Sequence, residues 1–180
     1  RKQADLAASY VPPFVLDYSV AEDGASEMVR DRAIGAMLGL AIGEAVGITL
    51  QGWPRDNGRE MNDMFGGGVL DLRPGQWAAD TAMALALVDS LTWRQELDEV
   101  DFMERLLEWE DEGVYSCTGG CVGIGKTTAE ALARYRQTGD PIASSIQGAF
   151  PSNGSLVRIA PVAIRYWNDK AKLREVAERQ

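Results

Sequence analysis

The segment Arg32–Gly47, RAIGAMLGLAIGEAVG, decides the fold, because it combines apolar residues at helical spacing with a glycine at every fourth position. Ser26 suits the N-cap of such a helix. Each glycine inside a helix costs about 0.8–1 kcal/mol relative to alanine. A ridge of glycines is tolerable only where another backbone packs closely against it. Since Glu44 and the flanking charges argue against a membrane dimerisation helix, we expect a buried central helix.

The rest of the chain shows helical patterns separated by loops. Residues 49–78 are rich in glycine and proline and are expected to be irregular. Apolar residues then recur at helical spacing, and capping residues divide the pattern. They predict four helices, Thr81–Trp93, Asp98–Glu112 ended by Gly113, Lys126–Thr138 ended by Gly139, and Ser155–Trp167. A last helix, capped by Asp169, is predicted after them. No segment alternates with the period of two that a strand requires. The sequence therefore predicts an all-α fold.

Composition excludes several classes of function. The chain has 180 residues, of which 46% are hydrophobic and 25% charged, so a globular domain is expected. Its formal charge of −9 argues against binding to nucleic acid or to an anionic membrane, which both need clustered positive charge. The sequence contains no histidine. Any acid–base or metal chemistry is therefore expected to depend on carboxylates.

The sequence divides into an N-terminal arm, residues 1–25, and one domain, residues 26–180. In the arm, Pro12-Pro13 favours extended backbone and Asp23-Gly24 is a turn signal. Its apolar residues predict that it docks, either on its own domain or on a partner protein. Two cysteines are too few for a disulfide scaffold. Neither a signal peptide nor a membrane span of about 20 apolar residues is evident, so a cytoplasmic location without membrane contact is expected.

Four motifs, in order, suggest a family. They are Arg32–Gly47, GQWAADTAMALALVDSL at Gly75–Leu91, GVYSCTGGCVGIGKTT at Gly113–Thr128 and SNGSLVRIAPVAIRY at Ser152–Tyr166. Their order and spacing resemble the ADP-ribosylglycohydrolase family over about residues 30–170. The resemblance implies an orthogonal helical bundle, here a partial one.

The resemblance also implies a chemistry, the hydrolysis of the glycosidic bond that joins ADP-ribose to a protein side chain. In the family two Mg²⁺ or Mn²⁺ ions take part, and hard cations of this kind prefer oxygen ligands. The implied catalytic residues are Asp80, which is also the metal ligand, and Glu44. The implied partners are ADP-ribose or an ADP-ribosylated protein, together with an ADP-ribosylating toxin if this is an immunity protein. The implied substrate-binding residues are Tyr115, Ser116, Thr118, Gly119, Asn153, Gly154, Ser155 and Arg158.

The sequence departs from the family pattern at several functional positions. Ala78 and Ala79 stand where the family has Thr-Asp, the other metal ligands. Gly123 stands where relatives often have Asp, and Gln51 where the family has an acidic residue. A second metal motif of the family belongs beyond Gln180. We therefore expect weak or absent metal binding and impaired catalysis, whether the alanines are natural or engineered.

Two other interpretations remain open. The stretch Gly120–Thr127 matches the phosphate-loop pattern of NTPases, although no apolar strand precedes it. The second is a non-catalytic module that binds ADP-ribose or a partner on the same scaffold. On that interpretation Asp80 complements a helix dipole, Arg158 forms an ion pair and Asn153-Gly154 is a turn.

Overall fold

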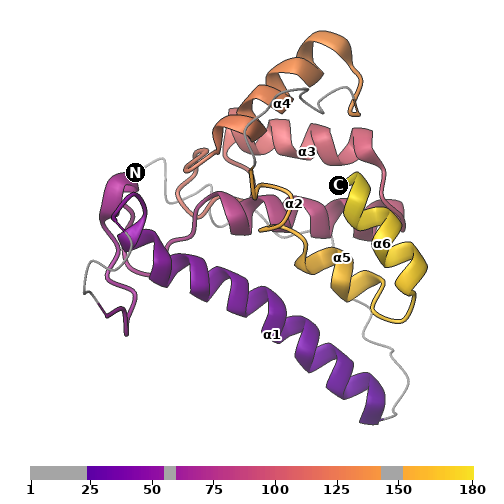
Figure 1. The fold of residues 1–180 in the computed structure, drawn as a ribbon, viewed down its shortest axis with the longest axis horizontal. Coiled ribbons are helices and arrows are strands. Elements are labelled where there is room, and N and C mark those ends of the chain that lie inside the picture. Colours follow the sequence, from indigo (N-terminus) through magenta and orange to yellow (C-terminus); the bar gives the residue numbers. More distant parts are fainter. Residues whose placement is uncertain (1–23, 55–59, 143–151) are drawn as a thin grey trace, which may run out of the picture. The chain divides into compact units, whose positions relative to one another are not determined.

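The computed structural model describes residues 24–54, 60–142 and 152–180. These residues form helices and one isolated bridge between Gly67 and Leu72, and none of them lies in a strand, which confirms the prediction of an all-α fold. The elements are α1 (Gly24–Gly47), the 3₁₀ turns η1 (Ile48–Leu50) and η2 (Gly68–Leu70), α2 (Ala79–Arg94), α3 (Glu99–Glu112), α4 (Lys126–Thr138), α5 (Ala160–Arg165) and α6 (Lys170–Arg179) (Figure 1).

The structure divides within α1, after Arg32. The second unit, Ala33–Gln180, includes the C-terminal half of α1 and every later element. All contacts described below lie within this unit. Most of the predicted arm, residues 1–25, lies outside the described residues.

The main core forms where α2 packs against α3 and α5. Leu87 of α2 and Trp109 of α3 are completely buried there, and Val162 of α5 and Val176 of α6 complete the same cluster. The predicted apolar stripe of α2 thus supplies core residues, because positions three and four apart share one helical face.

The ends of α3 and α4 and the start of α6 follow the predicted capping residues, whereas α1 begins at Gly24, before the predicted N-cap Ser26. The Asp98 carboxylate accepts a hydrogen bond from the Asp101 amide at 3.0 Å, and α3 ends at Gly113, whose φ is 73°. Gly139 ends α4 with a φ of 68°, and the Asp169 carboxylate caps α6. A left-handed residue after a helix favours glycine because it has no Cβ to clash.

The predicted helix Ser155–Trp167 was wrong in its extent. The structure has turns up to Ile159 and a short helix, α5, at Ala160–Arg165. The Asn153 carbonyl accepts the amides of Leu156 and Val157, which closes a turn. Pro161 then lies in the first turn of α5, where its missing N–H costs no hydrogen bond. Proline therefore sets a later start than the apolar pattern predicts.

The prediction that α1 is a buried central helix was also wrong for the part of the chain that the structure describes. No residue from 33 to 44 is buried, and only near its C-terminal end does α1 enter the protein, through Ala45. A Cβ built on Gly35, Gly39, Gly43 or Gly47 meets nothing within 4 Å. By length and composition alone, Glu27–Leu50 is also apolar enough to cross a membrane, with a mean hydropathy of 1.8.

Candidate functional site

The start of α2 is held by a carboxylate from α1. Ala78 occupies the N-cap position and has no side-chain oxygen to accept the first amides of the helix. The Glu44 carboxylate acts as the cap instead, because its Oε1 accepts a hydrogen bond from the Asp80 amide at 3.0 Å and its Oε2 accepts one from the Thr81 amide at 2.9 Å. These amides are the second and third of the helix, which a capping side chain ordinarily satisfies. Glu44 thus orients the segment that contains Asp80.

Asp80 lies beside Glu44 in a partly buried position. Burial, together with the charge of Glu44, raises the pKa of Asp80 from 3.8 to about 6. A carboxyl group that titrates this close to neutrality can accept or donate a proton under physiological conditions. The Thr81 hydroxyl next to it is buried and has no hydrogen-bond partner among the described residues.

Both carboxylates line a cavity of about 540 Å³. Helix α1 lines it with Gly39 and Gly43, and the start of α2 lines it with Ala78 and Ala79. Gly123 and Gln51 complete the lining. Four positions that differ from the family pattern therefore meet around one cavity: Gln51, Ala78, Ala79 and Gly123.

Gly123 has a φ of 75°, a backbone conformation that favours glycine. A Cβ at this position would lie 3.1 Å from the Ala78 Cβ and 3.1 Å from the Leu70 Cδ1. The turn and its close neighbours therefore require a small residue here. Sequence reasoning treated Gly123 as a lost acidic residue and had no signal for this steric constraint.

The loop after α3 fixes Trp77, which directly precedes Ala78. The Trp77 amide donates to the Cys117 Sγ at 3.2 Å, and the thiol donates back to the Trp77 carbonyl at 3.2 Å. The Trp77 indole Nε1 donates to the Tyr115 carbonyl at 3.1 Å. Sequence reasoning missed this role of Cys117. The spacing of the two residues, 40 positions apart, gave no signal for it.

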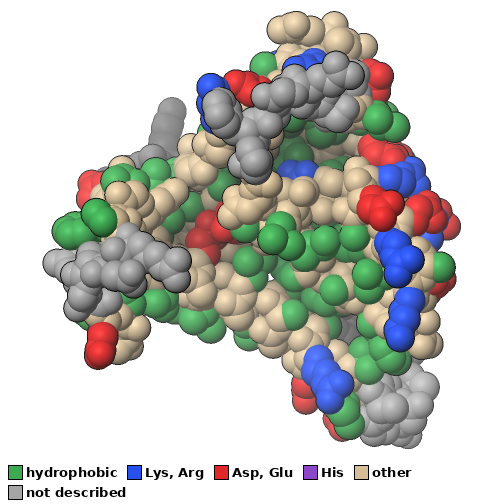
Figure 2. Space-filling model, in the orientation of Figure 1, with side chains coloured by type: hydrophobic (Ala, Val, Ile, Leu, Met, Phe, Trp, Pro, Cys, Tyr) green, Lys and Arg blue, Asp and Glu red, His purple; other side chains and the backbone are tan. Residues whose placement is uncertain are grey.

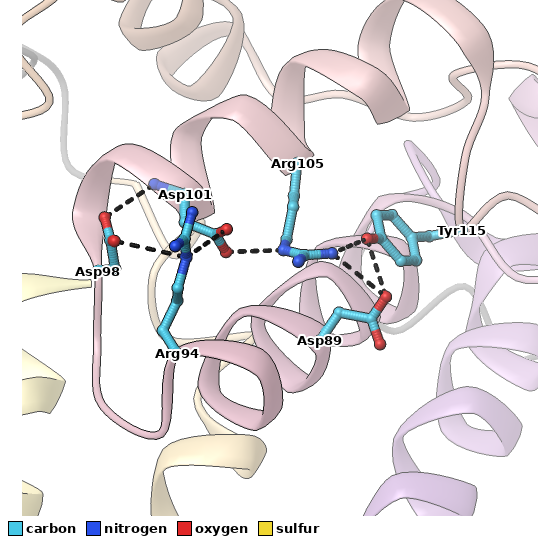
Figure 3. A network of polar contacts seen from close by, with 6 residues as sticks. All are labelled: Asp89, Arg94, Asp98, Asp101, Arg105 and Tyr115. Atoms are coloured by element: carbon cyan, nitrogen blue, oxygen red, sulfur yellow. Dashed lines mark hydrogen bonds and ion pairs between the residues drawn. The ribbon is translucent and has the colours of Figure 1, made fainter. Parts of the chain in front are cut away.

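Tyr115 belongs to a polar network that ties this loop to α2 and α3 (Figure 3). Its hydroxyl accepts from Arg105 of α3 at 3.0 Å and donates to Asp89 of α2 at 3.1 Å. Arg105 also pairs with Asp101 at 2.7 Å. Burial, with the charge of Asp89, raises the pKa of Tyr115 to about 12, so the hydroxyl stays protonated. The Tyr115 hydroxyl thus supports the contact between α2 and α3, while its backbone carbonyl holds Trp77 before the start of α2.

Three predicted substrate-binding residues, Gly154, Ser155 and Arg158, line a different cavity of about 510 Å³. The Arg158 Nε donates to the Gln180 Oε1 at 3.0 Å, and its guanidinium lies 4.9 Å from the centre of the Phe102 ring. Burial lowers the pKa of Arg158 to about 10. Within the described residues Arg158 contacts Gln180 and Phe102 and forms no ion pair, which does not match the alternative interpretation of a surface ion pair.

The other predicted substrate-binding residues lie in exposed loops. The Ser116 and Thr118 hydroxyls hydrogen-bond to each other at 2.8 Å, and Gly119 adopts a φ of 78° in the same loop. Asn153 is exposed, and its carbonyl closes the turn before α5. The Gly154 turn approaches α4, since a Cβ on Gly154 would lie 3.1 Å from the Thr128 Oγ1. The structure thus brings together Glu44 and Asp80, but distributes the substrate-binding set over other surfaces.

The described residues do not fit a resident divalent cation. No group of three acidic, cysteine or histidine side chains converges among them. Asp80 and Glu44 supply two carboxylates, but both oxygens of Glu44 accept backbone amides. Mg²⁺ demands near-octahedral oxygen coordination. Ala79, where the family pattern has a ligand, is buried in the apolar core cluster.

Comparisons with known proteins agree with the motifs. A family model described as ADP-ribosylglycohydrolase matches residues 25–180. The ADP-ribosylarginine hydrolase Tri1 of Pseudomonas putida is 41% identical over 138 residues, which cover 77% of this chain and 37% of that protein. The ADP-ribosyl-[dinitrogen reductase] glycohydrolase of Rhodospirillum rubrum is 35% identical over 140 residues, 77% of this chain and 45% of that protein.

A solved structure titled ADP-ribosylglycohydrolase-related protein complex superposes with a TM-score of 0.71 at 38% identity, and covers 85% of this chain and 48% of that chain. The fold predicted from the motifs is therefore confirmed. The chain spans less than half the length of these relatives.

Proposed function

The chain belongs to the ADP-ribosylglycohydrolase family, and on that premise we propose that it forms part of a hydrolase that removes ADP-ribose from modified protein side chains. The observation that supports this most is the pairing of Asp80 with Glu44 at the start of α2, on the wall of a cavity of about 540 Å³. Glycosidic bonds are hydrolysed through positively charged transition states, which nearby carboxylates stabilise.

In this proposal the two carboxylates have different tasks. Glu44 is a positioning residue, because its oxygens are engaged by the amides of Asp80 and Thr81. Asp80 is the group that faces the substrate and holds or moves a proton, since its pKa lies at about 6. Here we assign no step to a metal, and propose that Mg²⁺ or Mn²⁺ binds weakly.

Catalysis by the chain alone is expected to be low, because Ala78 and Ala79 stand at ligand positions of the family pattern. The test uses a chimera in which the matched segment of Pseudomonas putida Tri1 is replaced by the corresponding residues of this chain. Release of ADP-ribose from ADP-ribosylarginine, with Mg²⁺ present, is measured by chromatography. We expect little release from the chain and from the simple chimera.

The substitutions Ala78→Thr and Ala79→Asp in the chimera should restore turnover. Asp80→Asn, added to them, should abolish it again. A restored chimera that hydrolyses nothing would contradict the proposed activity. Turnover that survives Asp80→Asn would contradict the task given to Asp80.

A second candidate is a non-catalytic module that binds ADP-ribose or a protein. It is favoured by the burial of Ala78 and Ala79 in apolar clusters, an arrangement that a neutral binding surface tolerates and a metal site does not. Calorimetry with ADP-ribose, with and without Mg²⁺, separates the two functions. Binding of equal strength in both conditions supports the module, whereas binding that requires Mg²⁺ supports the hydrolase.

An immunity function against an ADP-ribosylating toxin, and a cytoplasmic location, remain part of this proposal. The formal charge of −9 and the apolar residues of the arm, residues 1–25, favour docking to a basic partner. Removal of residues 1–25 should then weaken toxin binding in a pull-down assay. Unchanged binding would contradict a role of the arm.

A further inference from the structure

Three large hydrophobic side chains are exposed on the segment that joins α1 to α2. Trp53, Phe65 and Val69 are 50%, 56% and 68% exposed, and we call them the loop patch. A Cβ built on Gly52 would lie 3.5 Å from the Val69 Cγ1, so Val69 packs beside the residue that precedes Trp53. Hydrophobic side chains gather on the part of the surface that this segment forms (Figure 2). Large apolar and aromatic side chains exposed together mark a binding surface.

The backbone beneath the loop patch is held in place by contacts between η1 and η2. The buried Thr49 hydroxyl of η1 donates to the Gly66 carbonyl at 2.9 Å. A Cβ on Gly68 of η2 would lie only 2.7 Å from the Ile48 carbonyl oxygen, so the two turns pack backbone to backbone. A surface that is already ordered binds a partner without the entropic cost of ordering it. The loop patch is therefore suited to recognition.

The loop patch adjoins the cavity of about 540 Å³ that contains Asp80, which we call the Asp80 cavity. Ile48 and Gln51 line this cavity, and Gln51 lies only two residues before Trp53. The same turn, η1, packs on η2, which contains Val69. A ligand that extends out of the Asp80 cavity past η1 therefore meets the loop patch.

The chemistry of the loop patch selects its occupant. The diphosphate and ribose hydroxyls of an ADP-ribosyl group need polar partners, which apolar side chains do not supply. The protein that carries this group continues past the modified side chain as a polypeptide with apolar residues of its own. We propose that the loop patch binds apolar residues of the substrate protein next to its ADP-ribosylated side chain. The inference rests on the proposed function, because it takes the Asp80 cavity to receive the ADP-ribosyl group.

Two synthetic peptides test the proposal on the chain itself. Each carries one ADP-ribosylated arginine, which is flanked by leucines in the first peptide and by serines in the second. Calorimetry with Mg²⁺ present measures the affinity of the chain for each peptide and for ADP-ribose. The leucine peptide should bind at least about tenfold more tightly than the serine peptide, because burial of one large apolar side chain has an effect of that size.

Substitutions in the loop patch should remove the preference for the leucine peptide. Val69→Ser and Phe65→Ser should each reduce the difference between the two peptides to less than about threefold, because the apolar contact is lost. The matched control is Val100→Ser on α3, where the side chain is 48% exposed. It should change the difference by no more than about twofold, as surface substitutions usually do. All three variants should keep the parent's affinity for ADP-ribose, which also shows that they fold.

Two results would overturn this inference alone, with ADP-ribose still bound at the Asp80 cavity. The first is equal affinity for the two peptides, or a difference that survives both Val69→Ser and Phe65→Ser. The second is self-association of the chain that Val69→Ser abolishes, which would identify a second copy as the occupant. If ADP-ribose instead leaves the amide NMR signals of Asp80 and Thr81 unmoved, the proposed function fails and this inference fails with it. The two failures are thus distinguishable.

Discussion

Gly123 and Gly119 lie in the same loop and have nearly the same positive φ angles, 75° and 78°. Their surroundings differ. A Cβ on Gly123 would press on Ala78 and Leu70 at 3.1 Å, whereas a Cβ on Gly119 meets nothing within 4 Å. The same substitution at both positions therefore separates the energetic cost of backbone strain from the cost of a steric contact beside the candidate site.

Gly119→Ala should lower the free energy of unfolding by about 1 kcal/mol, the usual effect of alanine at positive φ. Gly123→Ala should cost about 1–2 kcal/mol more, because the new methyl overpacks the start of α2. Urea denaturation of both variants provides the measurement. Equal losses would show that the contact with Ala78 has no energetic effect.

The raised pKa of Asp80 predicts how the stability of the protein depends on pH. Because its pKa rises from 3.8 to about 6 on folding, the folded protein holds a proton that the unfolded chain releases. Its contribution to stability is complete below pH 3.8 and is lost as the pH rises through about 6. The substitution Asp80→Asn removes this pH-dependent loss of stability, because asparagine does not titrate.

The stability of Asp80→Asn relative to the parent should therefore increase between pH 3.8 and about 6. Denaturant titrations across this range measure it, with the exposed Glu60→Gln as a control. A constant difference between Asp80→Asn and the parent would mean that Asp80 is not perturbed.

At the scale of elements, α2 begins on a cap supplied by another helix. Glu44 of α1 accepts the two amides that Ala78 leaves without a partner. The cap couples the position of α1 to the position of Asp80. Glu44→Ala should lower the free energy of unfolding by about 1–2 kcal/mol through loss of this cap.

A local cap should compensate for the distant one. Ala78→Ser in the Glu44→Ala background should recover at least about 0.5 kcal/mol, because a serine at the N-cap accepts the same amides. In the parent the substitution should bring less, since Glu44 already occupies them. A gain of equal size in both backgrounds would contradict the coupling of the two residues.

The network around Arg105 should be worth more than an exposed pair. The Arg105 and Asp101 side chains are only 18% and 11% exposed. Although burial pushes the pKa of Asp101 upward, hydrogen bonds from Arg105 and Arg94 hold it below its ordinary value. Arg105→Met should cost about 2–3 kcal/mol, because it leaves partly buried acids without a partner.

Lys126→Met, which removes an exposed pair with Glu130, should cost less than about 0.5 kcal/mol. Thermal denaturation ranks the two variants. The excess loss in Arg105→Met should shrink as the pH falls, since a carboxyl with a lowered pKa stabilises the fold only while it is ionised. Similar losses in both variants would contradict a structural role of the network.

The elements were largely predictable from local signals. Asp98, Gly113, Gly139 and Asp169 set helix ends through chemistry within a few residues of the chain. The extent of α5 was not predictable, because the apolar pattern continues through a turn that the Asn153 carbonyl closes. The burial of α1 was not predictable either, since it depends on residues far away in sequence.

The candidate site shows the same division. The motifs identified Glu44 and Asp80, and the structure places them in contact. Their relationship, in which one carboxylate holds the backbone of the other, needs the three-dimensional fold. The two hydrogen bonds between Cys117 and Trp77 also need the three-dimensional fold, because they join residues with no common motif.

At the scale of the whole chain, the candidate site joins segments that lie far apart in the sequence. The glycine row of α1 forms a wall of the Asp80 cavity and also an open surface beside it. The central claim is that the cavity at the start of α2 receives the ADP-ribosyl group.

A titration of ADP-ribose into the ¹⁵N-labelled chain, followed by amide NMR spectra, tests this claim most directly. The amides of Asp80 and Thr81, which Glu44 holds, and the amide of Gly123 on the same cavity should shift in a saturable way. Asp80→Asn should alter the affinity obtained from those shifts. Amides of Asp80, Thr81 and Gly123 that stay unmoved while ADP-ribose binds elsewhere, or does not bind, would contradict it.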